Sequence, residues 1–411
     1  MKKNFFTLLF AMAANVGMMN ATGIEVNGIW YLFDNSTKTA TVTYGGSDYN
    51  NNDNYYYGDI TVPSSVSYDG NTYTVTSIGN QAFVGCGGIT SIVLPNTITS
   101  IGEYAFSGCW DLSSINIPNS VTRIGRGAFR GCDSFPEEND IRYADTYLIK
   151  ALDKEKSSYT IKTGTRWIGD EAFHGFKNLT SFDIPNGIIE IGFQAFQGCS
   201  SLASVTIPNS VTTIGSGAFW DCSSLTSIDI PNSVTSIERK AFQGCAFSSV
   251  TIPNTVTNLE GYAFAKCENL ISVVIPNSIT SLEEDLFWSC TSLTSVTIPS
   301  SVIEIKKAVF LQCTNLNKIF NYGETPANTY SNAFDGVNKS TCKLYVPKNS
   351  INLYKSAAVW RDFYNVEAVE DVQAIDEVAT DKVQGVKVVR NGKVLIRKGE
   401  KTYTMLGQEA E

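Results

Sequence analysis

Ten cysteines are the residues of this chain best suited to covalent or metal chemistry, and nine of them recur at an almost constant spacing. Cysteine can form disulfides, ligate zinc or act as a nucleophile, and each role needs a particular geometry. Successive members of the series lie 22 or 23 residues apart, with one wider gap. The series consists of Cys86, Cys109, Cys132, Cys199, Cys222, Cys245, Cys267, Cys290 and Cys313, and Cys342 lies outside it.

The regular spacing favours free, buried thiols over a metal site or disulfides. Equal positions of stacked coils point in the same direction, and parallel Cα–Cβ bonds do not give the dihedral angle of a disulfide. Phe176 stands where the series would place a cysteine, which fits packing better than pairing. The chain also lacks a Cys-x-x-Cys pair of the kind that zinc sites use. We therefore expect a thiol column without metal or cofactor and a lone thiol at Cys342, with a disulfide framework as the alternative.

The remaining polar residues do not predict catalysis. His174 is the only histidine, and its position varies from repeat to repeat, which is typical of a solvent-facing residue. The acidic run 283–285 predicts a solvated turn, because a glycan-cleaving site would need carboxylates held in a fixed arrangement. Nucleophile-elbow and phosphate-loop motifs are both absent from the sequence. We therefore expect no enzymatic activity.

The cysteine spacing belongs to a longer repeat that must position all of these side chains. An Ala-Phe pair, or Leu-Phe or Val-Phe in its place, precedes most of the cysteine positions by three residues. The pair occurs eleven times, so the chain contains eleven recognisable units. The aromatic residues are Phe83, Phe106, Phe129, Phe173, Phe196, Phe219, Phe242, Phe264, Phe287, Phe310 and Phe334.

Within one unit, the sequence predicts two short extended segments and a helical turn. Residues 225–230 alternate between apolar and small polar types, which is the period of a strand, and Pro231 ends that strand. Residues 234–237 predict a second short strand, and 238–244 a short helical turn that Gly244 ends. One unit cannot bury its own Ile, Val and Phe, but stacked units can, at about 4.8 Å per coil. We therefore expect a mostly β repeat solenoid with a parallel sheet and terminal caps.

These residues resemble the BspA-like, or treponemal-type, leucine-rich repeat, whose pattern is LxxIxIPxSVxxIGxxAFxxCxxL. The resemblance extends over about 58–360 and is specific, since the period, the proline, the Ala-Phe pair and the cysteine coincide in many units. It implies a leucine-rich repeat stack in a secreted or surface protein of the Bacteroides and Prevotella kind. It further implies adhesion or host interaction as the commonly proposed role, and the family offers no catalytic residues to carry over.

The flanking segments predict an exported chain. A basic start followed by an apolar stretch that is too short to span a bilayer is typical of a signal peptide. The segment 386–411 predicts three short strands and resembles the tails of exported Bacteroidetes proteins, either as a sorting signal or as a small β tail of other use. We predict a signal peptide at 1–21, an N-terminal cap at 22–76, the repeats at 77–321 with an insertion at 133–165, a closing repeat at 322–364, an acidic linker at 365–385 and the β tail at 386–411.

The charge and hydropathy of the chain limit the classes of partner and the locations that we expect. A net charge of -9 and a pI near 4.9 argue against nucleic acid, because phosphate binding needs a concentrated basic face. No segment after the signal peptide is apolar over the length of a membrane span, so we expect an exported chain that is either secreted or held at the cell surface by other means. We expect this chain to be a monomer. Within the insertion, 147–163 is expected to be a degenerate unit with a charged hairpin tip.

Large aromatic residues near the Ala-Phe pairs form the candidate ligand surface. Tryptophan and tyrosine supply much of the binding energy of interfaces, and here they stand where other units carry Ser, Gln or Arg. Trp220 and Trp288 are three coils apart, about 15 Å at strand spacing, which suits an extended protein or glycan partner. The alternatives are aromatics that merely cover loops, and a spacer or matrix scaffold without a ligand. The candidates are Tyr104, Trp110, Phe193, Trp220, Tyr262 and Trp288.

Overall fold

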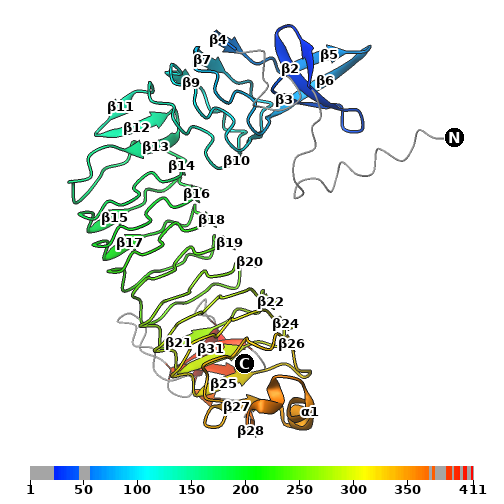
Figure 1. Cartoon of the computed structure of the whole chain (residues 1–411), viewed down its shortest axis with the longest axis vertical. Helices are drawn as coiled ribbons and strands as arrows, with labels where there is room; N and C mark the ends of the chain where they lie inside the picture. The colour runs from blue at the N-terminus through cyan, green and yellow to red at the C-terminus, as the bar shows by residue number, and fades with distance from the viewer. Residues whose placement is uncertain are drawn as a thin grey trace, which may run out of the picture. The chain divides into compact units, whose positions relative to one another are not determined.

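The structure, a computed structural model, describes residues 23–45 and 56–369, together with the backbone of five short strands beyond them (Figure 1). The predicted signal peptide at 1–21 lies outside the described residues. The chain divides into two compact units, 1–136 and 137–411, which are treated separately below as unit 1 and unit 2.

Unit 1 begins with an antiparallel sheet that continues into parallel coils. Strand β3 pairs antiparallel with β2 and parallel with β6, and the last two residues of β6 pair parallel with β8. The predicted end of the cap at residue 76 therefore falls within β6, whose last two residues belong to the first coil of the stack. The strands are β1 (Ile24–Val26), β2 (Ile29–Asp34), β3 (Thr39–Thr43), β4 (Gly58–Thr61), β5 (Ser65–Tyr68), β6 (Asn71–Ile78), β7 (Ile89–Val93), β8 (Ser100–Ile101), β9 (Ser114–Ile115) and β10 (Arg123–Ile124).

Unit 2 begins with three antiparallel strands, β11 (Glu137–Glu138), β12 (Ile141–Ala144) and β13 (Tyr147–Ala151), and β13 also pairs parallel with β14. The hairpin turn between β12 and β13 lies at 145–146, before the charged run 153–156. The prediction of a charged hairpin tip is therefore wrong, because pairing with β14 fixes β13 in the stack and leaves the charged run in the following loop.

One parallel ladder of two-residue strands runs along unit 2 from β14 to β20 (Figure 1). A second ladder of the same kind runs from β22 to β26, and the two ladders do not pair with each other. The strands of the first are β14 (Trp167–Ile168), β16 (Glu190–Ile191), β18 (Thr213–Ile214), β19 (Ser236–Ile237) and β20 (Asn258–Leu259), and those of the second are β22 (Ser281–Leu282), β24 (Glu304–Ile305) and β26 (Asn328–Thr329).

Another side of each coil carries the strand predicted before the proline, although 225–230 itself is not a regular strand. These strands form two separate ladders, one of β15 and β17 and one from β21 to β28. The second ladder extends past the predicted closing repeat, because β28 pairs in register with β27. The linker predicted for 365–385 therefore begins four residues too early. The strands are β15 (Ser181–Asp183), β17 (Ser204–Thr206), β21 (Ser272–Val274), β23 (Ser295–Ile298), β25 (Lys318–Asn321), β27 (Lys343–Val346) and β28 (Asn365–Ala368).

The Ala-Phe segment is a hydrogen-bonded turn, and the prediction of a short helical turn there is wrong. In most coils the N–H of this phenylalanine donates to a carbonyl oxygen of the next coil. The acceptor is the residue that precedes the phenylalanine of that coil, as in the bond from Phe219 to Ala241 at 2.8 Å. In ten units the residue before this pair has a left-handed backbone, which a helix cannot contain; examples are Lys240 at φ 61° and Tyr262 at φ 61°. The turn therefore works as a third ladder between coils.

Helices among the described residues occur only in the closing segment, as η3 (Lys348–Ser350), α1 (Ile351–Ser356) and η4 (Trp360–Asp362). The indole N–H of Trp360, a buried residue, donates to the carbonyl oxygen of Ala327 at 3.1 Å and so fixes this segment on the last coil. In the described part of the chain, no helix has the length and apolar character that crossing a bilayer requires.

The predicted tail contains the three expected strands, β30 (Val386–Arg390), β31 (Lys393–Lys398) and β32 (Lys401–Thr404), which pair antiparallel. Two further short strands, β29 (Gln373–Ala374) and β33 (Glu409–Ala410), pair antiparallel with β30 and β32. The turns predicted between the three strands lie outside the described residues.

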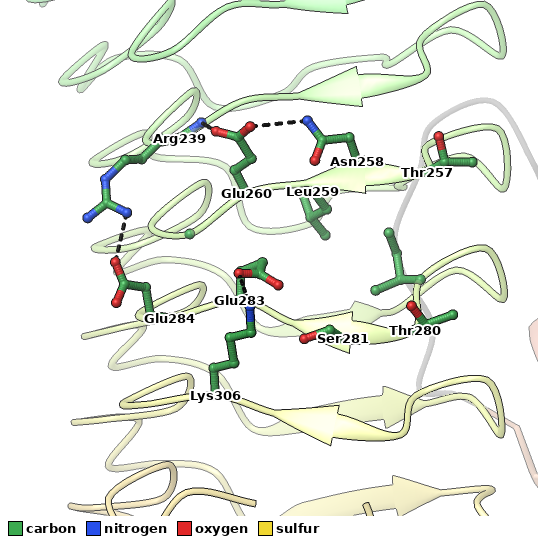
Figure 2. Close-up of a pocket in the computed structure, with 12 residues that line it drawn as sticks. Arg239, Thr257, Asn258, Leu259, Glu260, Thr280, Ser281, Glu283, Glu284 and Lys306 are labelled. Carbon is green, nitrogen blue, oxygen red and sulfur yellow. Dashed lines mark hydrogen bonds and ion pairs between the residues drawn. The ribbon is translucent and has the colours of Figure 1, made fainter. Parts of the chain in front are cut away.

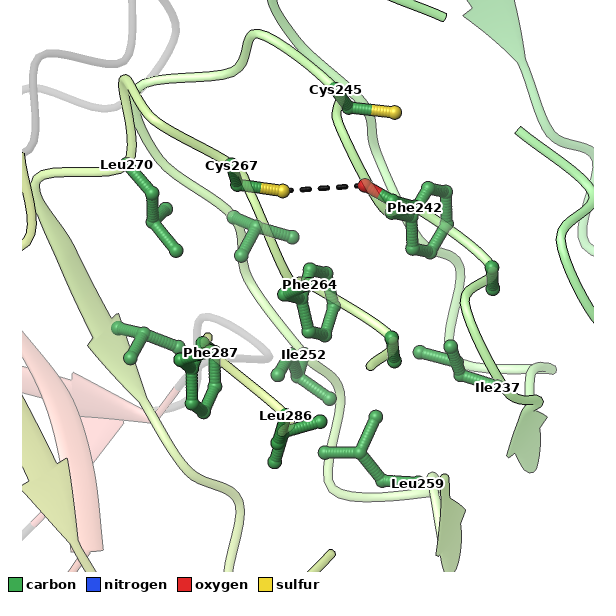
Figure 3. Packing of buried hydrophobic residues seen from close by; sticks show 14 of the residues in the cluster. Ile237, Phe242, Cys245, Ile252, Leu259, Phe264, Cys267, Leu270, Leu286 and Phe287 are labelled. Carbon is green, nitrogen blue, oxygen red and sulfur yellow. Dashed lines mark hydrogen bonds between the residues drawn. The ribbon is translucent and has the colours of Figure 1, made fainter. Parts of the chain in front are cut away.

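A column of stacked phenylalanines forms the centre of the core. The ring of Phe219 lies 5.3 Å from that of Phe196 and 5.6 Å from that of Phe242, with interplanar angles of 2° and 3°. Phe242, Phe264 and Phe287 continue the column (Figure 3). Every coil therefore supplies the same side chain to the same layer, as the repeat predicts.

The cysteines form the expected column of free thiols. All ten are buried and unpaired. In the column, each thiol from Cys109 onward donates to the carbonyl oxygen of a phenylalanine in the preceding coil, as from Cys267 to Phe242 at 3.3 Å (Figure 3). Burial raises the pKa of the thiols, to about 12 for Cys132 and Cys199. The thiols therefore stay protonated at neutral pH and fasten one coil to the next.

Thiol titration tests this column directly. We expect about ten reactive thiols in denaturant, one for each cysteine, and almost none in the native chain, because burial excludes the reagent and suppresses the thiolate. The measurement is the absorbance change with dithionitrobenzoate after preparation without reductant. A denatured count near zero would show that the thiols are paired as disulfides.

Candidate ligand-binding surface

The structure brings three of the six candidate aromatics together on unit 2. The ring of Tyr262 meets that of Trp288 edge-on, with centroids 6.3 Å apart and planes at 86°. Lys240 Nζ lies 4.6 Å from the ring centroid of Trp220 and 5.7 Å from that of Tyr262, so it joins the two rings. Lys266 Nζ lies 4.9 Å from the ring centroid of Trp288. We call these five residues the aromatic ridge.

The Ala-Phe turn explains why these side chains meet. Trp220 and Trp288 directly follow the buried phenylalanines of their coils, so each turn directs them away from the core. Tyr262 and Lys240 occupy the left-handed position before the alanine in adjacent coils. Because the coils stack in register, positions that recur in the repeat become neighbours in space. The ridge is therefore half-buried and held by the stack rather than by a loop.

Charged groups surround the ridge. The Arg239 guanidinium lies 4.4 Å from the ring centroid of Tyr262, and its Nη1 pairs with Glu284 Oε1 at 2.8 Å. Burial raises the pKa of Asp221 and Asp285 above the usual carboxyl value, against the opposing effect of nearby Lys266 and Arg239. The ridge thus offers aromatic faces beside both cations and carboxylates.

The other candidates lie elsewhere. Trp110 in unit 1 is 62% exposed, and its ring packs against Gly87, where a Cβ would lie 2.7 Å from Trp110 Cε3. Tyr104, also in unit 1, covers Gly127, where a Cβ would lie 2.5 Å from the tyrosine ring. Phe193 is half-buried in the coil before Trp220. Glycine leaves the room that the Trp110 and Tyr104 rings fill, so these two rings cover neighbouring backbone.

Beside the ridge lies a polar groove of about 540 Å³ that the sequence did not indicate (Figure 2). It opens between β20 and β22, and Arg239 links it to the ridge because the same guanidinium contacts Tyr262. Asn258 Nδ2 donates to Glu260 Oε1 at 3.2 Å on one rim (Figure 2). The lining residues are Arg239, Thr257, Asn258, Leu259, Glu260, Gly261, Ile279, Thr280, Ser281, Glu283, Glu284 and Lys306.

The acidic run 283–285 lies at a solvent-accessible turn beside the groove, as expected. Lys306 Nζ binds Glu283 Oε2 at 2.8 Å, and Arg239 binds Glu284, so two carboxylates of the run 283–285 are in ion pairs (Figure 2). Within the described residues, His, Cys, Asp and Glu form no cluster that could hold a metal ion. His174 is exposed, as expected from its variable position. The groove is therefore lined mainly by polar and charged side chains, two pairs of which are already in ion pairs.

In the earlier coils a glycine follows the ladder strand, and a Cβ at Gly215 would lie 2.6 Å from the carbonyl oxygen of Ile191. From Glu238 to Lys306 a charged residue replaces this glycine in the coils of unit 2, and β19 and β20 still pair although Glu238 and Glu260 directly follow them. The replacement is therefore not specific to the open corner between β20 and β22.

The sequence matches the model of one protein family, described as the BspA type leucine rich repeat region, with six copies. The matches cover residues 52–142, 153–270 and 235–358, which together make up more than half of the chain. They include the coils that carry the ridge and the groove. No curated protein matches the chain.

Several solved structures are similar to the chain. A leucine-rich repeat protein from Bacteroides ovatus is 26% identical, with a TM-score of 0.36, over 84% of this chain and 100% of that one. A leucine rich cell surface protein from Faecalibacterium prausnitzii is 21% identical, with a TM-score of 0.30, over 85% and 95% of the two chains. The leucine rich repeat protein of T. pallidum is 20% identical, with a TM-score of 0.28, over 72% and 91%.

Proposed function

Because the chain belongs to the BspA-type leucine-rich repeat family, we propose that it is a non-enzymatic protein that binds a partner through the surface of its repeats. The partner is a host protein, another cell or a glycan, and the role is adhesion. The aromatic ridge is the contact surface within this proposal. A spacer or matrix scaffold without a discrete ligand is the competing function.

One observation supports this proposal above the others, namely the joining of Trp220, Tyr262 and Trp288 into one ridge. Aromatic residues that stay partly exposed on a rigid scaffold lose little conformational entropy on binding and supply large contact areas. The neighbouring Lys240 and Lys266 hold the rings through cation–π contacts and leave them oriented before a partner arrives.

We further propose that the chain acts outside the cytoplasm, at the cell surface or in secretion. The basic and apolar start of the sequence supports export. The similar Faecalibacterium prausnitzii protein is described as a cell surface protein, which agrees with this proposal. In either location, the BspA-type repeats would be the part of the chain that is exposed to a partner.

The test is a binding panel with the full chain against matrix proteins, mucin and a set of glycans at physiological salt. We expect saturable binding to at least one of them. Replacing both Trp220 and Trp288 by alanine should weaken that binding at least about 30-fold, since an aromatic hot spot contributes about 2 kcal/mol or more. The readout is the dissociation constant from biolayer interferometry.

The matched control is Gln197→Ala, which changes the residue that follows the buried phenylalanine in another coil. It should leave both the affinity and the fold unchanged, because truncations of surface residues usually cost little stability. Circular dichroism must show that the double variant keeps its fold. Equal binding by the double variant and the wild type would exclude the ridge, and a panel without any saturable partner would favour the scaffold.

A further inference from the structure

The ladder along unit 2 is interrupted at one place, between β20 and β22. At the preceding junction, the N–H of Glu260 donates to the carbonyl oxygen of Ile237 at 3.0 Å, and at the following one Lys306 donates to Leu282 at 2.9 Å. The corresponding bond from Glu283 to Leu259 is absent from this described part of the chain. At the intact junction between β18 and β19, the N–H groups of Thr235, Ser236 and Glu238 donate to carbonyls of the preceding coil. The corresponding bonds from Thr280, Ser281 and Glu283 to the carbonyls of Thr257 and Leu259 are not formed between the described strands β20 and β22.

The interruption is local, because the same two coils are joined on their other sides. At the Ala-Phe turn, the N–H of Tyr262 donates to the carbonyl oxygen of Glu284 at 3.1 Å. On the side of β21, the N–H of Ile271 donates to the carbonyl oxygen of Ser248 at 2.9 Å. The opening is therefore a formed feature of a folded stack, and the groove of about 540 Å³ occupies it.

The ladder bonds that are missing here would join acceptors on one rim to donors on the other. The β20 rim carries the carbonyls of Thr257 and Leu259, and the β22 rim carries the N–H groups of Thr280, Ser281 and Glu283. An extended polypeptide carries N–H and C=O groups on each of its edges, so it can donate to one rim and accept from the other. A glycan has no regular series of donors and acceptors at this spacing. The main-chain groups therefore favour a peptide.

The side chains around the rims agree with this choice. Thr257 and Thr280 are exposed and leave the entrance free of bulky groups. The lining carries three carboxylates and two cations, so it is slightly acidic and suits a peptide with polar or basic side chains. On one rim the lining runs from Thr257 to Gly261, a length of about 16 Å at strand spacing. Four or five residues of an extended peptide are about this long.

We propose that the groove between β20 and β22 binds an extended polypeptide segment by strand addition. The bound segment donates N–H groups to the carbonyls of Thr257 and Leu259 and accepts hydrogen bonds from the N–H groups of Thr280 and Glu283. This inference rests on the proposed function only in assuming a binding role for unit 2. It names the chemical class of a partner and relies on main-chain groups that the aromatic ridge does not include.

Hydrogen exchange of the full chain tests the free groups first. The amides of Thr280, Ser281 and Glu283 should exchange faster than those of Thr235, Ser236 and Glu238, which hold the same positions in an intact junction. Equal protection of the two sets would overturn the proposal, because the groove would then be closed in solution.

The binding test uses an array of random 12-residue peptides as the probe. We expect some peptides to be retained and to slow the exchange of the three free amides. Thr280→Trp, which fills the entrance, should reduce their retention at least tenfold. The matched control is Thr212→Trp, an exposed threonine at the same position of an intact junction, which should leave retention unchanged.

Backbone methylation of a retained peptide separates main-chain from side-chain recognition. Methyl groups on alternate nitrogens should abolish binding in one register and be tolerated in the other, since only alternate N–H groups of a strand face one rim. Equal binding of both methylated forms, failure of the array to retain any peptide, or competition by glycans alone would each overturn the proposal. A partner could fail to bind the double alanine variant of Trp220 and Trp288 and still bind Thr280→Trp. That result would support the proposed function and overturn the inference about the groove.

Discussion

Replacing Phe219 by alanine is expected to lower the free energy of unfolding by about 3–5 kcal/mol, the usual cost of removing a buried phenylalanine. The ring is fully buried and stacks face to face with Phe196 and Phe242. The coil that carries it is hydrogen-bonded to the coils on both sides, so the backbone cannot collapse into the cavity. The measurement is urea unfolding followed by circular dichroism.

The control for this variant is His174→Ala, which truncates an exposed residue directly after another phenylalanine of the column. It should change the free energy of unfolding by less than about 0.5 kcal/mol. A Phe219→Ala loss as small as that of the control would contradict the layered core, because it would place the ring outside a tightly packed column.

Raising the pH from 8 to 10 is expected to destabilise the protein steeply, by about 1.4 kcal/mol per buried thiol for each pH unit above about 9. Burial holds the pKa of Cys132 and Cys313 at about 12, whereas an exposed thiol ionises near 8.5 to 9. The unfolded chain therefore loses thiol protons first and gains stability relative to the native chain. The contribution of the neutral thiols is complete below pH 8 and is lost as the pH rises toward 12.

The control for the alkaline effect is Cys245→Ala, which removes one fully buried thiol of the column. The free energy of unfolding of this variant should fall less steeply with pH than that of the wild type, because one buried thiol fewer contributes to the slope. This comparison of slopes holds whatever the stability of the variant at pH 8. Urea midpoints at several pH values, in the presence of reductant, give both slopes. Stability that stays constant from pH 8 to 10 would show that the thiols are already ionised or exposed in the native chain.

The sequence was sufficient to predict the coils and the core because every unit repeats the same environment. Phe219 and Cys222 recur in register, and a residue type that recurs at a fixed period must occupy an equivalent position in each coil. The confirmed features are the parallel stacking, the free thiols and the solenoid. All three depend only on what the units share.

The Ala-Phe turn was predicted wrongly because its backbone leaves little trace in composition. The left-handed position before the alanine holds glycine in two coils, at Gly127 and Gly217, which could have served as a signal. Elsewhere Gln81, Glu171 or Lys240 occupies it, and those residue types suggest a helix. Hydrogen bonds to the next coil, which are a property of the stack, stabilise the turn instead.

The candidate surface could be predicted only in part. Choosing exposed aromatics from the repeat found Trp220 and Trp288, but the repeat cannot show that Lys240 bridges two rings from a third coil. The groove depends on how two particular coils differ from the others. The sequence does not mark this difference, because a glutamate also follows the ladder strand at Glu238, where the junction between β19 and β20 is closed.

The break between β20 and β22 also affects how the stack responds to force. A bend that opened the corner between β18 and β19 would have to break the hydrogen bonds that Thr235, Ser236 and Glu238 donate across it. The same bend between β20 and β22 breaks none of the bonds of this ladder, so this ladder resists such a bend least at that junction. A partner that pulls on Tyr262 and Trp288, which stand on these two coils, would therefore strain the groove before any other junction of the ladder.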